Sequence, residues 1–363
     1  MKKYKIAVYA ICKNEEKFVD QWYNSMKEAD EIYVLDTGST DNTVEKLKKH
    51  NIIIKKANIT PWRFDIARNI SLNMIPEDVD ICVCTDLDEI FNKGWRKELE
   101  KVWNKDANIC RYTYNWKLDE YNNPKISFMY EKIHSRNNFN WIYPVHEVLS
   151  YNGINKVIVE NPNIILNHYP DNKKSRNNYL QLLELSIKEN PNNDRNLHYL
   201  GREYMYHKKW NKSIDTLIKH IYLPSSIWKD EKAASMRFIS RDYLNLNRID
   251  EARMWLSKAI NEAPYLRDAY IELALLEYNE KNWKEVIKNI NKALKIKVHQ
   301  KTYINEIFSW DHTPYDLLSI AYYNINNYKK ALTCVNKAIK MSPNDNRLKL
   351  NKLIIKEKAN QND

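Results

Sequence analysis

The spacing of apolar residues changes about halfway along the chain. Before about residue 170, short apolar runs rich in Ile, Val, Tyr and Cys alternate with stretches in which apolar residues return every three or four positions. The first kind of run is typical of buried strands and the second of amphipathic helices. The expected strands cover 5–11, 31–36, 51–56 and 80–86, and the expected helices between them cover 15–29 and 41–50. This alternation predicts βαβ units, and therefore an α/β domain with a mainly parallel sheet.

Three further apolar runs, at 108–117, 125–135 and 157–168, follow without helical stretches between them. We expect these runs to add strands that make the sheet mixed. Residues 1–172 are therefore expected to form one Rossmann-like α/β domain.

From about residue 175 onward the pattern is helical throughout, and it repeats. Small residues, which let two helices approach closely, recur at Gly201, Ser240 and Ala274. The 34 residues from Ser240 to Ala274 match the period of a tetratricopeptide repeat. Longer intervals of 39 and 45 residues predict insertions near 222–228 and 297–312.

About four helix pairs fit into this region, followed by a polar capping helix near 346–358. Stacked helix pairs bury a continuous core and form a concave groove suited to an extended peptide. Residues 173–363 are therefore expected to form an all-α tetratricopeptide-repeat solenoid. Its large aromatic residues either line the groove or pack between helices: Tyr204, Trp210, Trp228, Trp255, Tyr270, Trp283 and Trp310.

Charge is distributed unevenly between the two parts. Residues 1–170 contain 24 basic and 24 acidic side chains, so the whole net charge of +11 falls on the second part. Either this basic surface attracts an acidic partner, or it reflects a proteome rich in lysine and asparagine. The basic residues are spread over many helices and mixed with acids, so we expect no nucleic-acid binding.

No stretch approaches the ~18 consecutive apolar residues of a membrane helix, and the amino end lacks a signal-peptide cleavage site. We therefore expect a cytoplasmic protein without a membrane span.

Acidic residues directly follow two of the expected strands. Asp36 ends the run EIYVLD, and Asp86 and Asp88 follow the run DICVC in the sequence TDLDE. In an open α/β sheet, ligands bind at the carboxyl ends of the strands. Carboxylates crowded at a strand end repel one another, and a hard divalent cation shared with substrate phosphates is the usual compensation.

These acidic residues belong to a longer series of sequence elements. An apolar strand ending near KNE is followed by VLDTGSTDNT, by WRFDIARN at 62–69 and by TDLDE. This order resembles the family 2-type glycosyltransferases of the GT-A fold. The resemblance implies that Asp36 binds the uracil ring, that Arg68 helps to hold the nucleotide base, and that Asp86 lies near the ribose. It also implies that Asp88 binds a Mn²⁺ or Mg²⁺ ion, which bridges the diphosphate of a UDP-sugar.

Two downstream elements supply candidates for catalysis and metal binding. The sequence WIYPVHE resembles the VHE element of many of these enzymes, which lies where the acceptor and the catalytic base meet. Inverting transfer needs a base within hydrogen-bond reach of the acceptor, and the candidates are Glu147 and then His146, unless His146 is a structural histidine. His168 in NHYP resembles the C-terminal metal ligand of several GT-A enzymes, or else it is a contact between the domains. His134 in EKIHSR is a further candidate.

GT-A domains fused to tetratricopeptide repeats resemble bacterial enzymes that modify polypeptides, including bacteriocin and flagellin glycosyltransferases. The resemblance implies an inverting, metal-dependent hexosyl- or N-acetylhexosaminyl-transferase that uses a UDP-sugar. Its acceptor would be a Ser, Thr or Cys side chain of a protein or peptide, which the repeats help to bind. Two alternatives remain open: a glycan or lipid-linked acceptor of the cell envelope, and an inactive scaffold that acts through its repeats. A homodimer is also compatible with the sequence.

Overall fold

In the computed structural model, which describes residues 4–171 and 178–361, the apolar runs of the N-terminal half form strands at every place predicted from the sequence. The strands are β1 (Ile6–Cys12), β2 (Glu31–Asp36), β3 (Ile53–Lys56), β4 (Ile81–Cys84), β5 (Glu89–Phe91), β6 (Ile109–Leu118), β7 (Pro124–Ser135), β8 (Phe139–Ile142), β9 (Val148–Tyr151) and β10 (Ile158–His168). The helices between and after them are α1 (Val19–Met26), α2 (Thr43–Lys49), α3 (Phe64–Leu72), α4 (Trp95–Val102) and α5 (Tyr179–Glu189).

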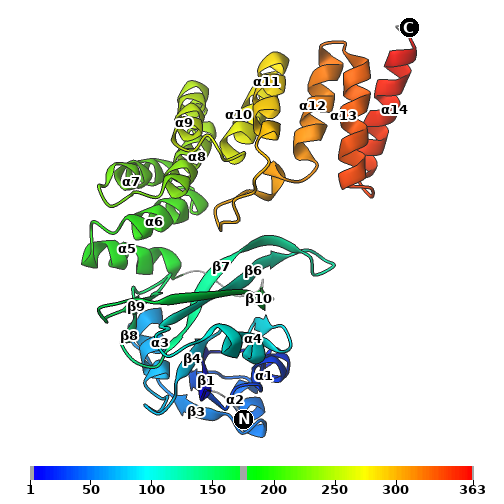
Figure 1. Ribbon diagram of the computed structural model, residues 1–363. Coiled ribbons are helices and arrows are strands. Elements are labelled where there is room, and N and C mark those ends of the chain that lie inside the picture. Colours follow the sequence, from blue (N-terminus) through cyan, green and yellow to red (C-terminus); the bar gives the residue numbers. More distant parts are fainter. Residues whose placement is uncertain (1–3, 172–177, 362–363) are drawn as a thin grey trace. The chain divides into compact units, whose positions relative to one another are not determined.

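Eight of these strands form one mixed sheet in the order β3-β2-β1-β4-β7-β6-β10-β5. Strand β1 is parallel to β2 and to β4, and β2 is parallel to β3. Strand β7 is antiparallel to β4 and to β6, and the long strands β6, β7 and β10 lie side by side (Figure 1). The sheet is thus parallel where βαβ units were expected and mixed where the later strands join it, as the sequence predicts.

Alternate side chains of β1 enter two separate cores, one on each face of the sheet. Ile6 and Val8 pack in a core shared with α1, α2 and α4. Ala7 and Tyr9 pack in a second core with α3 and β8. Because both faces are covered, β1 lies in the interior, which explains its nearly continuous apolar sequence.

The chain divides into two compact units, Met1–Glu189 and Asn190–Asp363. Helix α5 belongs to the first unit, where Arg63 Nη1 donates a hydrogen bond to Glu189 Oε1 at 2.5 Å. The first unit therefore ends at residue 189, whereas the sequence pattern changes near residue 172, before this helix.

The second unit is a stack of helix pairs, as the repeated pattern predicts. Its helices are α6 (Asp194–Tyr206), α7 (Trp210–Tyr222), α8 (Lys229–Asn245), α9 (Ile249–Glu262), α10 (Asp268–Asn279), α11 (Trp283–Lys295), α12 (Thr313–Asn324), α13 (Tyr328–Met341) and α14 (Asn346–Asn360), with a short 3₁₀ helix at Ile307–Ser309. The pairs α6–α7, α8–α9, α10–α11 and α12–α13 pack in sequence along the array, and α14 covers α13 (Figure 1). The two longest connections within the unit, 223–228 and 296–312, coincide with the predicted insertions.

Small residues in the repeats allow the helices to pack closely. A Cβ atom added to Gly201 would lie 2.4 Å from Leu217 Cγ, so α6 can approach α7 this closely only with glycine at that position.

Of the aromatic residues noted in the sequence, Tyr204 and Trp255 are buried and Trp228 is 41% exposed. The first two therefore pack between helices, while Trp228 is accessible. None of the described helices combines the length and the apolar character needed to cross a membrane.

Candidate functional site

Arg68 is the centre of a charged network in the first unit. It lies on α3, and the residue is only 3% exposed. Its Nη2 donates to Asp86 Oδ1 at 2.6 Å, and its Nε donates to Glu147 Oε1 at 3.1 Å. The network therefore joins three residues that the sequence motifs placed in one site, although they are up to 79 residues apart.

Lys132 adds a second buried cation to this network. It lies on β7, and its Nζ is 3.3 Å from Asp86 Oδ2 and 3.5 Å from Glu89 Oε1. Glu89 in turn accepts hydrogen bonds from the backbone N–H of Asp86 at 2.9 Å and from the Tyr114 hydroxyl at 2.7 Å. Asp86 is thus fixed from both sides, since each of its two carboxylate oxygens contacts a different cation.

The two cations decide the charge state of Asp86. Burial alone would raise the pKa of this carboxyl, but the positive charges of Arg68 and Lys132 outweigh burial and hold the pKa well below its usual range. Glu89 behaves in the opposite way. Burial raises the pKa of Glu89, and the adjacent charges of Asp86 and Asp88 act in the same direction, opposed by Lys132. Asp86 is therefore a firmly ionised hydrogen-bond acceptor at the end of β4.

Asp88 has different neighbours, although it is only two residues away. Its Oδ2 lies 3.5 Å from His168 Nε2, at the end of β10. His168 Nδ1 lies 3.2 Å from the carbonyl oxygen of Trp116, to which it donates as the Nδ1–H tautomer, and its ring stacks on the Trp116 indole. This tautomer leaves the lone pair on Nε2, facing the carboxylate. Burial opposes a positive charge on His168, but the contact with Asp88 outweighs burial and raises its pKa.

A carboxylate and an imidazole arranged in this way fit a divalent cation. Metal-binding histidines usually donate their other ring N–H to a carbonyl or a carboxylate, as His168 does to Trp116. Two protein ligands leave positions for substrate phosphates, as Mg²⁺ sites commonly do. Asp88 and His168 are therefore residues of this unit that could hold a divalent metal.

Helix α3 also fixes the segment that carries His146 and Glu147. The Asn69 side chain donates to the Trp141 carbonyl and accepts from the Trp141 N–H, both at 2.8 Å. Within this segment, Tyr143 and His146 have positive φ angles of 80° and 51°. Positive φ is uncommon outside glycine and is frequent at functional sites, where the surroundings enforce it. The His146 ring packs edge-on against Tyr179 of α5, with the ring centroids 5.8 Å apart.

Asp36 lies at the same edge of the sheet but outside the Arg68 network. It ends β2, and β1 separates β2 from β4, which leads to Asp86. Asp36 Oδ1 accepts a hydrogen bond from the backbone N–H of Ser39 at 3.1 Å, and the side chain is buried. The carboxyl ends of parallel strands thus bring Asp36, Asp86 and Asp88 to one edge.

Three residues of the network were not predicted: Glu89, Tyr114 and Lys132. Lys132 left a signal in the sequence, because a lysine interrupts the apolar pattern of the run at 125–135. Which carboxylates it contacts depends on the pairing of β4 with β7, and the sequence alone does not determine that pairing. His134, in contrast, is fully buried and its ring nitrogens contact Tyr9 and Ser135, so it stabilises the core.

Both parts of the chain match known families. Residues 7–161 match the family Glycosyl transferase family 2, and residues 313–345 match Tetratricopeptide repeat. The first match contains Asp36, Arg68, Asp86, Asp88 and Glu147, whereas His168 lies beyond its end.

Several solved structures are similar to the repeat half. They include the MamA protein (20% identity, covering 45% of this chain and 81% of that chain, TM-score 0.36), TTC0263 of Thermus thermophilus (15% identity, 48% and 88%, TM-score 0.34) and the tetratricopeptide protein YrrB (15% identity, 48% and 81%, TM-score 0.35). No curated protein matches the chain.

Proposed function

We propose that this glycosyltransferase, with its family 2 domain and its tetratricopeptide repeats, is an inverting, metal-dependent enzyme that transfers a sugar from a UDP-sugar to a protein or peptide. Domains of this family take a nucleotide-sugar donor, in general a UDP-sugar together with a divalent metal. The acceptor atom would be the oxygen of Ser or Thr or the sulfur of Cys.

The observation that carries this proposal is the pair formed by Asp88 and His168, next to the Arg68 network. With Mn²⁺ or Mg²⁺ bound there, the cation would neutralise the charge that develops on the departing diphosphate. The protein's own contribution is to hold the two ligands in place, by stacking His168 on Trp116 and by pairing the end of β10 with β5, which follows Asp88.

The nucleotide would be held by residues on either side of this pair. Asp36, at the end of β2, would accept hydrogen bonds from the uracil ring. Asp86, fixed by Arg68 and Lys132, would accept hydrogen bonds from the ribose hydroxyls. A rigid, ionised acceptor suits this role because it loses little conformational freedom when the ligand binds.

The transfer itself needs a base for the acceptor proton. The acceptor oxygen or sulfur forms a bond to the anomeric carbon while the bond from that carbon to the UDP oxygen breaks, and UDP leaves with the electron pair. We assign the acceptor proton to Glu147, with His146 as the second candidate. The ion pair with Arg68 uses Glu147 Oε1 and orients the carboxylate, so Oε2 is the atom that would take the proton.

The repeats would bind the acceptor polypeptide. Stacked helix pairs present a concave surface suited to an extended chain, and the net charge of +11 carried by this half favours an acidic segment. The catalytic domain and the repeats would then divide the work between sugar transfer and choice of acceptor.

Donor hydrolysis tests the proposal directly. The purified chain is incubated with UDP-glucose, UDP-N-acetylglucosamine, UDP-galactose and a GDP-sugar, each with Mn²⁺ and with EDTA, and nucleotide release is followed. We expect metal-dependent release of UDP from one UDP-sugar. Equal release with Mn²⁺ and EDTA would exclude the metal role, and no release together with no UDP binding would favour an inactive scaffold.

A further inference from the structure

A second group of metal-binding side chains lies in the repeat unit, where the proposed transfer does not use them. His198 on α6, His220 on α7 and Glu231 on α8 come from three successive helices, and these residues are 0%, 0% and 5% exposed. One potential ligand atom from each residue lies within 4.8 Å of those of the other two. Buried imidazole and carboxylate groups are rare in the core of a helical repeat, where apolar residues normally fill this space.

The two imidazoles share one hydroxyl group. Ser235 Oγ lies 2.7 Å from His198 Nδ1 and 2.9 Å from His220 Nδ1. A hydroxyl has a single hydrogen, so at least one imidazole must donate its Nδ1–H to Ser235 and carry its lone pair on Nε2. A hydroxyl can also accept from both rings, which leaves both Nε2 atoms as metal ligands. Metal-binding histidines are usually oriented by such a second hydrogen bond.

His198 leaves a polar atom without a partner. Among the described residues, its buried Nε2 forms no hydrogen bond. An unpaired buried nitrogen is unfavourable whether it carries a hydrogen or a lone pair. A bound cation would remove this cost by accepting the lone pair, and nothing else described in the core does so.

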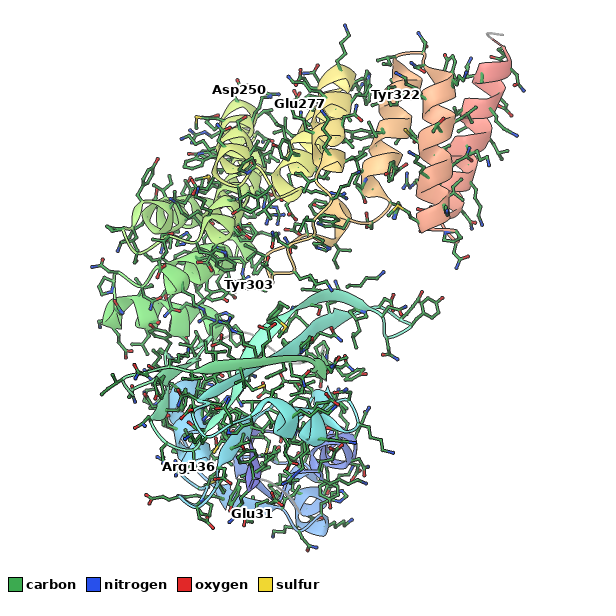
Figure 2. All side chains as sticks on the ribbon, in the orientation of Figure 1. Glu31, Arg136, Asp250, Glu277, Tyr303 and Tyr322 are labelled. Atoms are coloured by element: carbon green, nitrogen blue, oxygen red, sulfur yellow. The ribbon has the colours of Figure 1, made fainter. Side chains whose placement is uncertain are left out.

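Glu231 is oriented by contacts on both of its oxygens. Its Oε1 lies 3.4 Å from His220 Nε2, and its Oε2 accepts a hydrogen bond from the Tyr303 hydroxyl. Tyr303 belongs to the 296–312 connection that follows α11 (Figure 2). The Ser226 hydroxyl, 3.1 Å from His220 Nε2, adds a further oxygen to the cluster.

The charge around the cluster is compatible with a cation. Arg237, on the same helix as Glu231, is neutralised by Glu272 at 2.7 Å and by Glu306 at 3.2 Å. Glu231 itself has no arginine or lysine partner among the described ion pairs, and its two oxygens contact the His220 imidazole and the Tyr303 hydroxyl. A buried carboxylate without a cation is unfavourable, and a divalent ion would supply the missing charge.

We propose that His198, His220 and Glu231 form a structural site for Zn²⁺ in the repeat unit. Zinc is the divalent metal whose usual ligands are imidazole and carboxylate in a four-coordinate arrangement, with a hydroxyl or water as the fourth ligand. The ion would tie the first helix pair, α6–α7, to the second pair through α8. It would also fix the carboxylate that holds Tyr303 and the 296–312 connection.

The experiment uses the full-length, tag-free chain carrying Asp88→Asn, so that the donor-metal site proposed above contributes little. The protein is stripped with a chelator, dialysed against micromolar Zn²⁺ with excess Mg²⁺, and analysed for bound zinc. We expect one equivalent of Zn²⁺ and a rise in Tm of about 3–5 °C. No bound zinc and no change in Tm would overturn the proposal.

Two substitutions and one control locate the ion. His198→Gln and Glu231→Gln each remove a proposed zinc ligand, so each variant should lose the bound zinc and the rise in Tm. Both introduce side chains of similar size, and the amide oxygen in Glu231→Gln can still accept a hydrogen bond from Tyr303. We therefore expect no loss of helix content in either variant. His207→Gln changes an exposed histidine at the end of α6 and should retain both. If His198→Gln prevents folding, Glu231→Gln decides the question. Equal zinc binding by the parent and by either folded variant would overturn the assignment.

Discussion

Asp86 and Asp88 show how two residues of one short motif have different charged neighbours. Arg68 and Lys132 already neutralise Asp86, so a metal ion there would have to displace two buried cations. Asp88 has only the contact with His168 at 3.5 Å among the described ion pairs, and a metal bound between the two residues would replace it. Charge compensation therefore favours Asp88 over Asp86 as the proposed metal ligand.

Asp88→Ala tests this division at a single residue. Because the carboxylate is a proposed metal ligand, we expect its loss to reduce donor turnover by about 10²–10³-fold. UDP affinity measured by calorimetry should become the same with Mn²⁺ and with EDTA. The control, Asp106→Ala, removes an exposed acid of the same unit and should leave both properties unchanged. Full activity of Asp88→Ala would exclude Asp88 as a metal ligand.

Lys132→Met tests the second cation of the network. The substitution removes one of the two cations beside Asp86 and leaves the buried Glu89 carboxylate without its positively charged partner, so we expect the free energy of unfolding of the N-terminal unit to fall by about 3 kcal/mol. Lys125→Met is the matched control on the same strand, because Lys125 forms an exposed ion pair with Asp119 at 3.4 Å. It should cost less than about 1 kcal/mol. Urea denaturation measures both.

A second substitution separates charge from packing at Lys132. Adding Glu89→Gln to Lys132→Met removes the uncompensated carboxylate and keeps an acceptor for Tyr114. Most of the lost stability should return in the double variant. If it does not, Lys132 stabilises the unit through packing of its side chain rather than through its charge.

At the level of strands and helices, the elements with a long periodic pattern could be predicted from the sequence. β6, β7 and β10 begin and end within a residue of the expected runs. The short strands β5, β8 and β9 were not predicted, because three or four residues are too few to establish a period. The same limit applies to the site. The sequence placed acids at strand ends, but the pairing of β7 with β4 brings Lys132 to them.

Helix α8 contains a buried acid that makes stability depend on pH. Asp242 is fully buried, and among the described residues neither of its carboxylate oxygens has a hydrogen-bond partner. Burial raises its pKa to about 7, despite the nearby Ser213 hydroxyl. The folded state thus favours the protonated form. Its contribution to stability is complete below the unfolded pKa of about 4 and is lost as the pH rises through about 7.

Asp242→Asn should therefore stabilise the repeat unit only at higher pH. At pH 8 the wild-type carboxylate is charged and buried, so we expect the substitution to increase the free energy of unfolding by about 2 kcal/mol. At pH 4, near the unfolded pKa, the folded group is protonated and the unfolded group is about half protonated, so the difference should be small. Asp250→Asn, on the next helix, changes a side chain that is 96% exposed and should show no such dependence (Figure 2). Urea denaturation at both pH values would contradict the proposal if Asp242→Asn had the same effect at each.

For the whole molecule, the position of α5 decides where the chain can be divided. The pattern of the sequence changes near residue 172, but α5 belongs to the first unit and contacts it through Glu189 and Tyr179. The Tyr179 ring also packs against His146, a candidate base. A fragment ending at residue 172 would lose these contacts, whereas a fragment of residues 1–189 retains them.

These contacts lead to a test of how the two units share the reaction. We expect the 1–189 fragment to hydrolyse the donor at a rate within about threefold of the full chain, because it keeps the proposed metal pair and the Arg68 network. The 1–172 fragment should be less stable and slower, since His146 and Arg63 lose their partners on α5. Transfer to a Ser-, Thr- and Cys-containing peptide library, followed by mass spectrometry, should require the repeats and be lost from both fragments. If the 1–189 fragment modified the same peptides as efficiently as the full chain, the repeats would have no part in choosing the acceptor, and their role would lie with another partner.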